Sequence, residues 1–213
     1  MKKSNLSPVV LVMLLFVVAC SQAQSLDYSK YGMEAADVPV GLQKGDKAPE
    51  IMMTLDDGTD VSLAELYKKQ PVVVLFYRGY WCPVCNRYLA DFAKDAEKIE
   101  AKGAKIVAVT PQTYENAAMT AEKTGVGFTI VSDKDGSIMK AFDVDFKVTE
   151  DYQQKILKGL NTSIAETSAF EEAVLPVPAT FIIDKNGVVV YRQFDPDYRN
   201  RASVKDILAN LPE

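Results

Sequence analysis

Two cysteines, Cys82 and Cys85, are the residues of this sequence with the clearest capacity for chemistry. They are separated by two residues in the stretch FYRGYWCPVCNR, which follows an apolar run. The chain has three cysteines and no histidine. Hydrolases that depend on a histidine base are therefore excluded. Zinc needs about four ligands, usually cysteine or histidine, and haem attachment needs a histidine where Asn86 stands. Dithiol redox chemistry is favoured, and a structural disulfide is the alternative, although closing so short a loop removes little chain entropy.

A reactive cysteine must be ionised, because the thiolate is the nucleophile and a free thiol has a pKa of about 8.5. The end of a strand that leads into a helix would place Cys82 at the N-cap and Cys85 in the first turn. Unpaired amides and the positive end of the helix dipole favour an anion there. Arg78 and Arg87 bracket the pair and could add positive charge, or could be ordinary surface charges.

The elements around the cysteines follow from the apolar pattern. Residues 72–77 form a continuous, β-branched run that predicts a strand buried on both faces. Pro83 suits the first position of a helix, and apolar residues then recur at helical spacing until Gly103. The pattern predicts one helix over this range, followed by a strand over residues 105–109.

The same alternation continues along the chain. Before the cysteines we expect a hairpin over residues 51–63 with an Asp57-Gly58 turn, and a short helix through Tyr67 that starts with a capping box at Ser62 and Glu65. After them we expect a helix over 113–124, a strand over 128–131 and a short helix after Gly136. The chain should end with a strand over 180–184, an Asn186-Gly187 turn to the next strand, and a C-terminal helix capped by Ser203. These strands and helices predict an α/β protein of thioredoxin-like fold, with a mixed sheet and flanking helices.

Residues 143–175 interrupt the alternation. They contain a helical stretch in which Tyr152, Ile156, Leu157 and Leu160 share one face, followed by a polar loop. The stretch could cover the cysteines or bind a partner, but a packed surface helix is the simpler interpretation.

The N-terminus is typical of an exported protein. Lys2 and Lys3 precede an unbroken apolar run over residues 9–19, which is too short to span a membrane and predicts a signal peptide over residues 1–19. The sequence VVAC at its end is similar to the lipobox of bacterial lipoproteins, so we expect lipidation of Cys20. Residues 20–44 then serve as lipid anchor and tether, and residues 45–213 form the domain.

Charge limits the partners. The chain has 24 lysines and arginines against 29 acidic residues, a formal net charge of −5. We therefore expect no nucleic-acid binding, and membrane contact only through the lipid. The expected location is the cell envelope, on the extracytoplasmic side.

Three stretches together resemble the peroxiredoxin-like branch of the AhpC/TSA family in the thioredoxin superfamily. They are FYRGYWCPVCNRYLADF, LPVPATFIIDKNGVVVYRQFDPDY and the C-terminal helix. The resemblance implies that Cys85 occupies the register of the peroxidatic cysteine and that Cys82 replaces the usual threonine. It also implies a cis-proline at Pro178 facing the cysteines. The family has an arginine near the thiolate, and Arg201 resembles an arginine of the family's terminal segment. Arg78, which brackets the cysteines, and Trp81 are further candidate site residues.

Two functions remain open. In the first, a thiol-dependent peroxidase, one cysteine attacks a hydroperoxide and the other resolves the product to a Cys82–Cys85 disulfide, which a thioredoxin-like dithiol donor reduces. In the second, a thiol-disulfide oxidoreductase, Cys82 attacks protein disulfides and Cys85 releases the mixed disulfide. The family resemblance favours the first, whereas the CxxC spacing and the export signal favour the second. Neither function calls for a cofactor.

Overall fold

The computed structural model describes residues 26–55 and 58–212. The expected signal peptide, Cys20 and Asp57 of the first hairpin turn lie outside these residues. Within the described ranges, no helix combines the length and the apolar character needed to cross a membrane.

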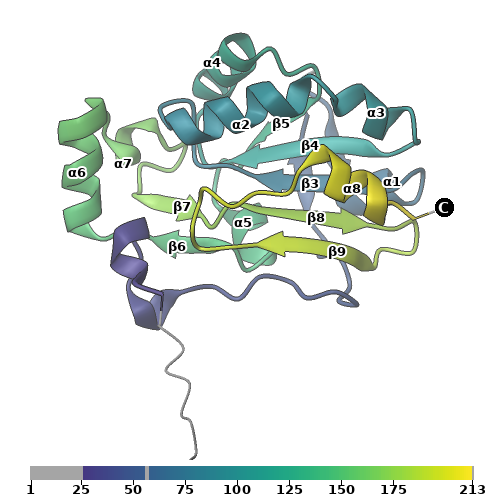
Figure 1. Ribbon diagram of the computed structural model, residues 1–213, viewed down its shortest axis with the longest axis horizontal. Coiled ribbons are helices and arrows are strands. Elements are labelled where there is room, and N and C mark those ends of the chain that lie inside the picture. The colour runs from purple at the N-terminus through teal and green to yellow at the C-terminus, as the bar shows by residue number, and fades with distance from the viewer. Residues whose placement is uncertain (1–25, 56–57, 213) are drawn as a thin grey trace, which may run out of the picture.

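The centre of the fold is a five-stranded sheet with the strand order β5-β4-β3-β8-β9 (Figure 1). β3 is parallel to β4 and β4 to β5, whereas β8 is antiparallel to β3 and to β9. The strands are β3 (Val72–Phe76), β4 (Lys105–Thr110), β5 (Thr129–Ser132), β8 (Ala179–Ile183) and β9 (Val189–Phe194). The mixed sheet expected from the sequence is confirmed.

Helices cover both faces of this sheet. Because successive side chains of a strand point to opposite faces, β3 sends Val73 and Leu75 into one core and Val72, Val74 and Phe76 into the other. The first core is covered by α2 (Pro83–Ala93), α3 (Ala96–Glu100), α4 (Tyr114–Thr124) and α8 (Val204–Asn210). The second is covered by α1 (Leu63–Tyr67) and α5 (Ser137–Ala141).

The smaller expected features are also present. β1 (Met52–Thr54) and β2 (Asp60–Ser62) form the first hairpin, and Ser62 and Glu65 make a full capping box at the start of α1. Ser203 caps α8 through the backbone amide of Asp206, in a second capping box.

The single helix expected up to Gly103 is wrong, because the chain forms α2 and α3 with a break between them. Asp95 has φ −122° and ψ 3°, and its amide bonds to the carbonyl of Phe92, three residues back. Phe92 before the break and Ile99 after it are both buried in the first core. The apolar spacing therefore continues through the break, and hydrophobic periodicity could not reveal it.

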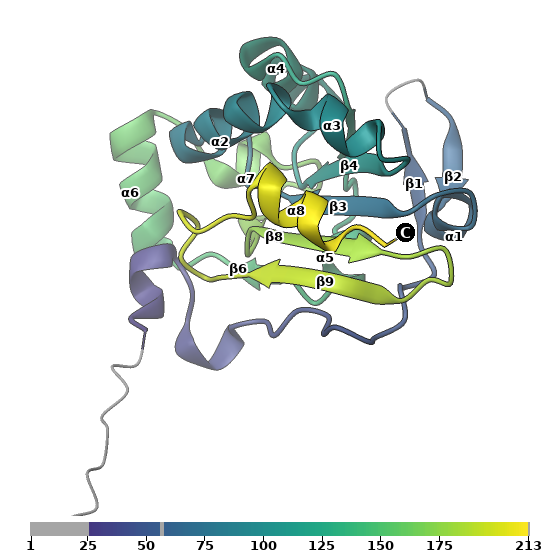
Figure 2. The same cartoon turned by 45° about the vertical axis from the view of Figure 1, so that its right-hand side comes forward.

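Residues 26–44 are part of the fold, so the expectation that order begins near Gly45 is wrong. The segment forms two short 3-10 helices, η1 (Tyr28–Tyr31) and η2 (Ala35–Asp37), and buries Tyr31 and Met33. It then runs along the sheet beside β9, where Arg192 donates to the carbonyl of Val40 (Figure 2). Isolated anchoring side chains have no period, so the sequence pattern gave no sign of them.

The segment 143–175 contains more structure than expected. It forms β6 (Asp145–Lys147), α6 (Glu150–Leu160), α7 (Ile164–Thr167) and β7 (Val174–Pro176), and β6 and β7 pair as a small antiparallel sheet. On α6, Tyr152 and Ile156 are buried, whereas Leu157 and Leu160 are 43% and 37% exposed. The expected surface helix is therefore confirmed, but its buried face is narrower than the four apolar residues predicted.

The packing of residues 26–44 can be tested by cavity formation. We expect Met33→Ala to lower the free energy of unfolding by about 2–4 kcal/mol, because Met33 is 2% exposed in the first core. The matched change Val40→Ala, at a side chain that is 65% exposed, should stay within about 0.5 kcal/mol. Urea unfolding of both variants measures the difference, and equal stabilities would show that this segment does not pack on the domain.

Candidate active site

The cysteines lie where β3 passes into α2. Cys82 is the N-cap residue of α2, and its Sγ accepts a hydrogen bond of 3.3 Å from the amide of Cys85 in the first turn. Pro83 occupies the first helical position. The expected placement of both cysteines at a helix start is confirmed.

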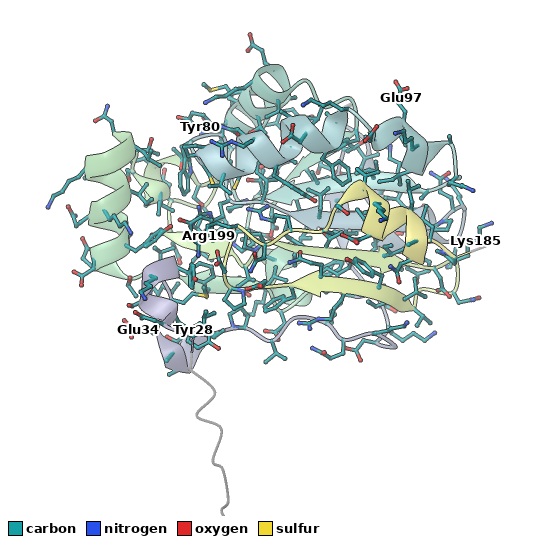
Figure 3. All side chains as sticks on the ribbon, in the orientation of Figure 1. Tyr28, Glu34, Tyr80, Glu97, Lys185 and Arg199 are labelled. Atoms are coloured by element: carbon teal, nitrogen blue, oxygen red, sulfur yellow. The ribbon has the colours of Figure 1, made fainter. Side chains whose placement is uncertain are left out.

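The loop between β3 and α2 is held from both sides. The amide of Tyr80 donates to Gln112 Oε1 at 2.7 Å, and Asn86 Nδ2 donates to the carbonyl of Tyr80 at 2.6 Å. Gly79 has φ +153°, and a Cβ there would lie 2.5 Å from Cδ of Gln112. The close approach of Gln112 therefore requires glycine and fixes the path of the chain into the helix. Figure 3 labels Tyr80 at the start of α2.

Two guanidinium groups contact the two sulfurs. Arg78 Nη2 lies 3.2 Å from Cys82 Sγ, and Arg201 Nη2 lies 3.4 Å from Cys85 Sγ. Both cysteine side chains have no exposed surface, and Arg78 is 4% exposed. The site therefore combines two positive charges with two sulfurs in a region from which water is excluded.

This environment separates the pKa values of the two cysteines. Burial by itself raises the pKa of Cys85, but the hydrogen bond from the Cys82 thiol and the charges of Arg201 and Arg78 outweigh it and hold that pKa well below its usual value. The same hydrogen bond, together with burial, raises the pKa of Cys82 well above its usual value. These two directions favour a thiolate on Cys85 and a proton on Cys82.

Aromatic side chains surround Arg78. Its Nη1 donates to Tyr152 Oη at 2.7 Å, and its Cζ lies 3.6 Å from the ring centroid of Tyr198 and 5.6 Å from that of Trp81. Burial lowers the pKa of Arg78, and the negative charge that the cysteines can take raises it by more. Trp81, a candidate from the sequence, thus contacts the arginine.

Arg201 comes from the segment between β9 and α8. Its Nε donates to the carbonyl of Tyr198 at 2.8 Å, and its Cζ lies 5.2 Å from the ring centroid of Tyr88 on α2. The structure therefore places Arg201 against Cys85, as the resemblance implied. Arg87, by contrast, is exposed and makes no contact with either sulfur.

A groove leads toward this site. It encloses about 740 Å³ between α2 and the start of α8. Apolar groups of Val84, Tyr88, Phe92 and Val204 form much of its wall. The charged lining is mixed, with four cationic side chains and two carboxylates: Arg87, Arg199, Arg201, Lys205, Asp91 and Asp95. Arg201 lines the groove and also contacts Cys85 Sγ, so it connects solvent-accessible space with the buried sulfur. Arg199 is labelled in Figure 3 on the segment that leads to α8.

Comparison with known proteins identifies the family. Residues 44–192, more than half of the chain, match the model of the AhpC/TSA family. The chain belongs to this family. Chloroplastic peroxiredoxin Q of Sedum lineare is 29% identical over 159 residues, which cover 73% of this chain and 73% of that protein. A Mycobacterium tuberculosis protein that is provisionally named a peroxiredoxin is 27% identical over 154 residues, covering 72% of this chain and 86% of its own.

Solved structures of peroxiredoxins have the same fold. Reduced Prx3 of Vibrio vulnificus in complex with hydrogen peroxide aligns with a TM-score of 0.61 at 19% identity, over 79% of this chain and 97% of that one. Peroxidoxin BcpB of Mycobacterium tuberculosis aligns with a TM-score of 0.56 at 20% identity, over 72% and 86%. The thioredoxin-like fold is thus confirmed, and with the AhpC/TSA match and the named relatives, the chain is a thiol-dependent oxidoreductase of the peroxiredoxin type.

The cis-proline implied by the thioredoxin superfamily is wrong for this chain. The Val177–Pro178 bond is trans. The amide of Val177 donates to the carbonyl of Val144 at 2.7 Å, so the chain runs extended from β7 directly into β8. Pro178 is buried, and because β3 and β8 pair Leu75 with Thr180, it lies at the end of the sheet where β3 leads to the cysteines.

Metal ligation has no basis in the described structure. Among residues 26–55 and 58–212, no group of three or more histidine, cysteine, aspartate or glutamate side chains is arranged to hold a metal ion.

Three tyrosines of the site escaped the sequence analysis. Tyr152 was assigned to the apolar face of a helix, and neither Tyr88 nor Tyr198 stood out. Tyr88 contacts Arg201, whereas Tyr152 and Tyr198 contact Arg78 across 74 and 120 residues of sequence. Only the tertiary fold brings such distant residues together, and no short motif marks them.

The assignment of the thiolate to Cys85 can be measured by the ultraviolet absorbance of the thiolate during a pH titration. In the reduced protein we expect absorbance that persists below the pH at which ordinary thiols are protonated. Cys85→Ser should remove this low-pH signal and Cys82→Ser should retain it. Arg201→Gln should move the midpoint to higher pH, because a positive charge beside the sulfur is lost. A low-pH signal that survives in Cys85→Ser would instead place the thiolate on Cys82.

Proposed function

We propose that this protein reduces hydroperoxides with the Cys85 thiolate and completes its cycle through a Cys82–Cys85 disulfide. The observation that carries the proposal is that two guanidinium groups contact two buried sulfurs of one helical turn, Arg201 at Cys85 and Arg78 at Cys82, an arrangement that favours an anion on Cys85 beside a protonated thiol. The family match and the relatives named as peroxiredoxins support the same reaction.

The first step is attack on the peroxide. The Cys85 thiolate displaces the leaving oxygen of the O–O bond, so that a sulfur–oxygen bond forms, sulfur is oxidised to a sulfenic acid, and the peroxide leaves as an alkoxide or hydroxide that takes up a proton. Negative charge moves from sulfur to oxygen during this step. Arg78 and Arg201, which already face the sulfurs, are placed to stabilise that charge in a site without water.

The second step resolves the sulfenic acid. The Cys82 thiol attacks the Cys85 sulfur, its proton and the hydroxyl leave as water, and a disulfide forms. A thioredoxin-like dithiol donor then reduces the disulfide to two thiols by exchange. Cys82 is suited to this step because it occupies the position of the threonine that is usual in the family, in the same helical turn as Cys85.

The groove between α2 and α8 is the route that the structure offers to a substrate. Its apolar wall and its arginines suit a hydroperoxide with an apolar body and a polar head. Arg201 would meet the peroxide before Cys85 does, because the arginine lines the groove and the sulfur is fully buried.

Disulfide exchange with a protein substrate is less well supported by the local geometry. An extended protein substrate would need free backbone groups beside the cysteines, and Val177, just before Pro178, is the nearest stretch of extended chain considered for this pairing. That residue is buried and its amide is already bonded to Val144.

The cysteine variants test the reaction. Cys85→Ser should abolish peroxide consumption, because the attacking sulfur is lost. Cys82→Ser should still form a sulfenic acid on Cys85 in a single turnover, detectable by dimedone labelling and mass spectrometry, but should fail in multiple turnovers with a dithiol donor. A wild-type protein that reduces a protein disulfide and consumes no peroxide with any dithiol donor would refute the proposal.

We further propose that the mature protein begins at a lipidated Cys20 and acts in the cell envelope, on the extracytoplasmic side. The apolar run over residues 9–19 and the VVAC sequence support this. Cys20→Ala should move the protein from the membrane fraction to the soluble fraction of a bacterial host and should prevent acyl labelling. Unchanged membrane association of this variant would contradict the anchor.

A further inference from the structure

We propose that Tyr152, on α6, is a positioning residue whose hydroxyl holds the Arg78 guanidinium against the cysteine pair. The proposal deepens the proposed function, since it gives a role to the segment 143–175. It depends on peroxidase activity only for its kinetic measurement, because the ionisation of the cysteines can be measured without a substrate.

Arg78 has no acidic partner among residues 26–55 and 58–212. None of the ion pairs in the described part of the chain includes it, although it is 4% exposed. Its Nη1 donates to Tyr152 Oη at 2.7 Å, and its Nη2 lies 3.2 Å from Cys82 Sγ. One end of the planar guanidinium is therefore fixed by a tyrosine while the other faces sulfur.

A tyrosine suits this place better than a carboxylate would. Burial raises the pKa of Tyr152 to about 12, so its hydroxyl is neutral near pH 7. A neutral oxygen accepts the hydrogen bond and orients the guanidinium without cancelling its charge. Aspartate or glutamate at the same place would form an ion pair with Arg78 and compete with the thiolate for it. The full positive charge of Arg78 thus remains available to the cysteines.

Other aromatic groups restrict the remaining freedom of Arg78. Tyr198 lies against the face of the guanidinium, 3.6 Å from its Cζ to the ring centroid. Tyr31 packs edge-on against Tyr198, with 5.9 Å between the centroids. Tyr152 therefore restrains the Arg78 guanidinium within its own plane, and Tyr198 restrains it perpendicular to that plane.

Tyr152 is itself held by the N-terminal segment. A Cβ at Gly32 would lie 2.7 Å from Cγ of Tyr152, so the ring packs directly on the glycine backbone. The amide of Thr149, which precedes α6, donates to the carbonyl of Gly32 at 2.9 Å. Figure 1 shows η1 beside the start of α6, and Figure 3 labels Tyr28 and Glu34 in this N-terminal segment. The packing on Gly32 holds the ring of Tyr152 in place, with its hydroxyl directed at Arg78.

The test is the variant Tyr152→Phe, which keeps the ring against Gly32 and removes only the hydroxyl. We expect the thiolate titration to move to higher pH, because Arg78 is less firmly held at the sulfurs, and kcat/KM for peroxide to fall about tenfold, equivalent to 1.4 kcal/mol. The matched control is Tyr67→Phe, since Tyr67 packs in the second core beside Gly187. It should leave both measurements unchanged.

The possible outcomes are distinct. A titration that moves in Tyr152→Phe and not in Tyr67→Phe supports the positioning role, even if the wild type consumes no peroxide. An unmoved titration in a Tyr152→Phe protein of native circular dichroism would show that the residue only packs, and it would overturn the inference. Equal shifts in both variants would overturn it as well, because the effect would then be a general one of losing a tyrosine hydroxyl.

Discussion

The structure depends on keeping a negative charge on sulfur where water cannot reach it. A buried thiolate is costly unless positive charge and hydrogen-bond donors replace its lost hydration. Here Arg201 contacts Cys85, Arg78 contacts Cys82, and the Cys82 thiol donates to Cys85. Each donor comes from a different part of the chain: the end of β3, the start of α2 and the segment before α8. The fold has to bring these parts together before the chemistry is possible.

Tyrosines, and no acidic partner in the described part of the chain, lie against the buried Arg78. Arg78 is in contact with Tyr152 from α6 and with Tyr198 from the C-terminal segment, and these contacts extend to Tyr31 near the N-terminus. Segments that seemed peripheral in the sequence thereby become the walls of the active site. Tyr31 of the N-terminal segment and Tyr152 of residues 143–175 thus meet around one arginine.

The sequence was sufficient for the parts that depend on local rules. The buried strand β3, the helix start at Cys82, the capping box at Ser62 and the cap at Ser203 follow from apolar period, turn residues and caps. The break at Asp95 did not follow, because the apolar spacing runs through it. The contacts of Tyr152 and Tyr198 did not follow either, since they join residues distant in sequence. The trans bond before Pro178 contradicted an expectation taken from the superfamily, and the pairing of Val177 with Val144 gives the reason.

The placement of both cysteines in one helical turn has a consequence for motion during the cycle. Two reacting sulfurs on separate elements have to be brought together by a movement of one element relative to the other. Here the partner sulfur is already at the cap of the same helix, and the amide of Cys85 points to it. In the cycle proposed above, the new bond would therefore join two residues of a single helical turn, and no second element would have to approach the first.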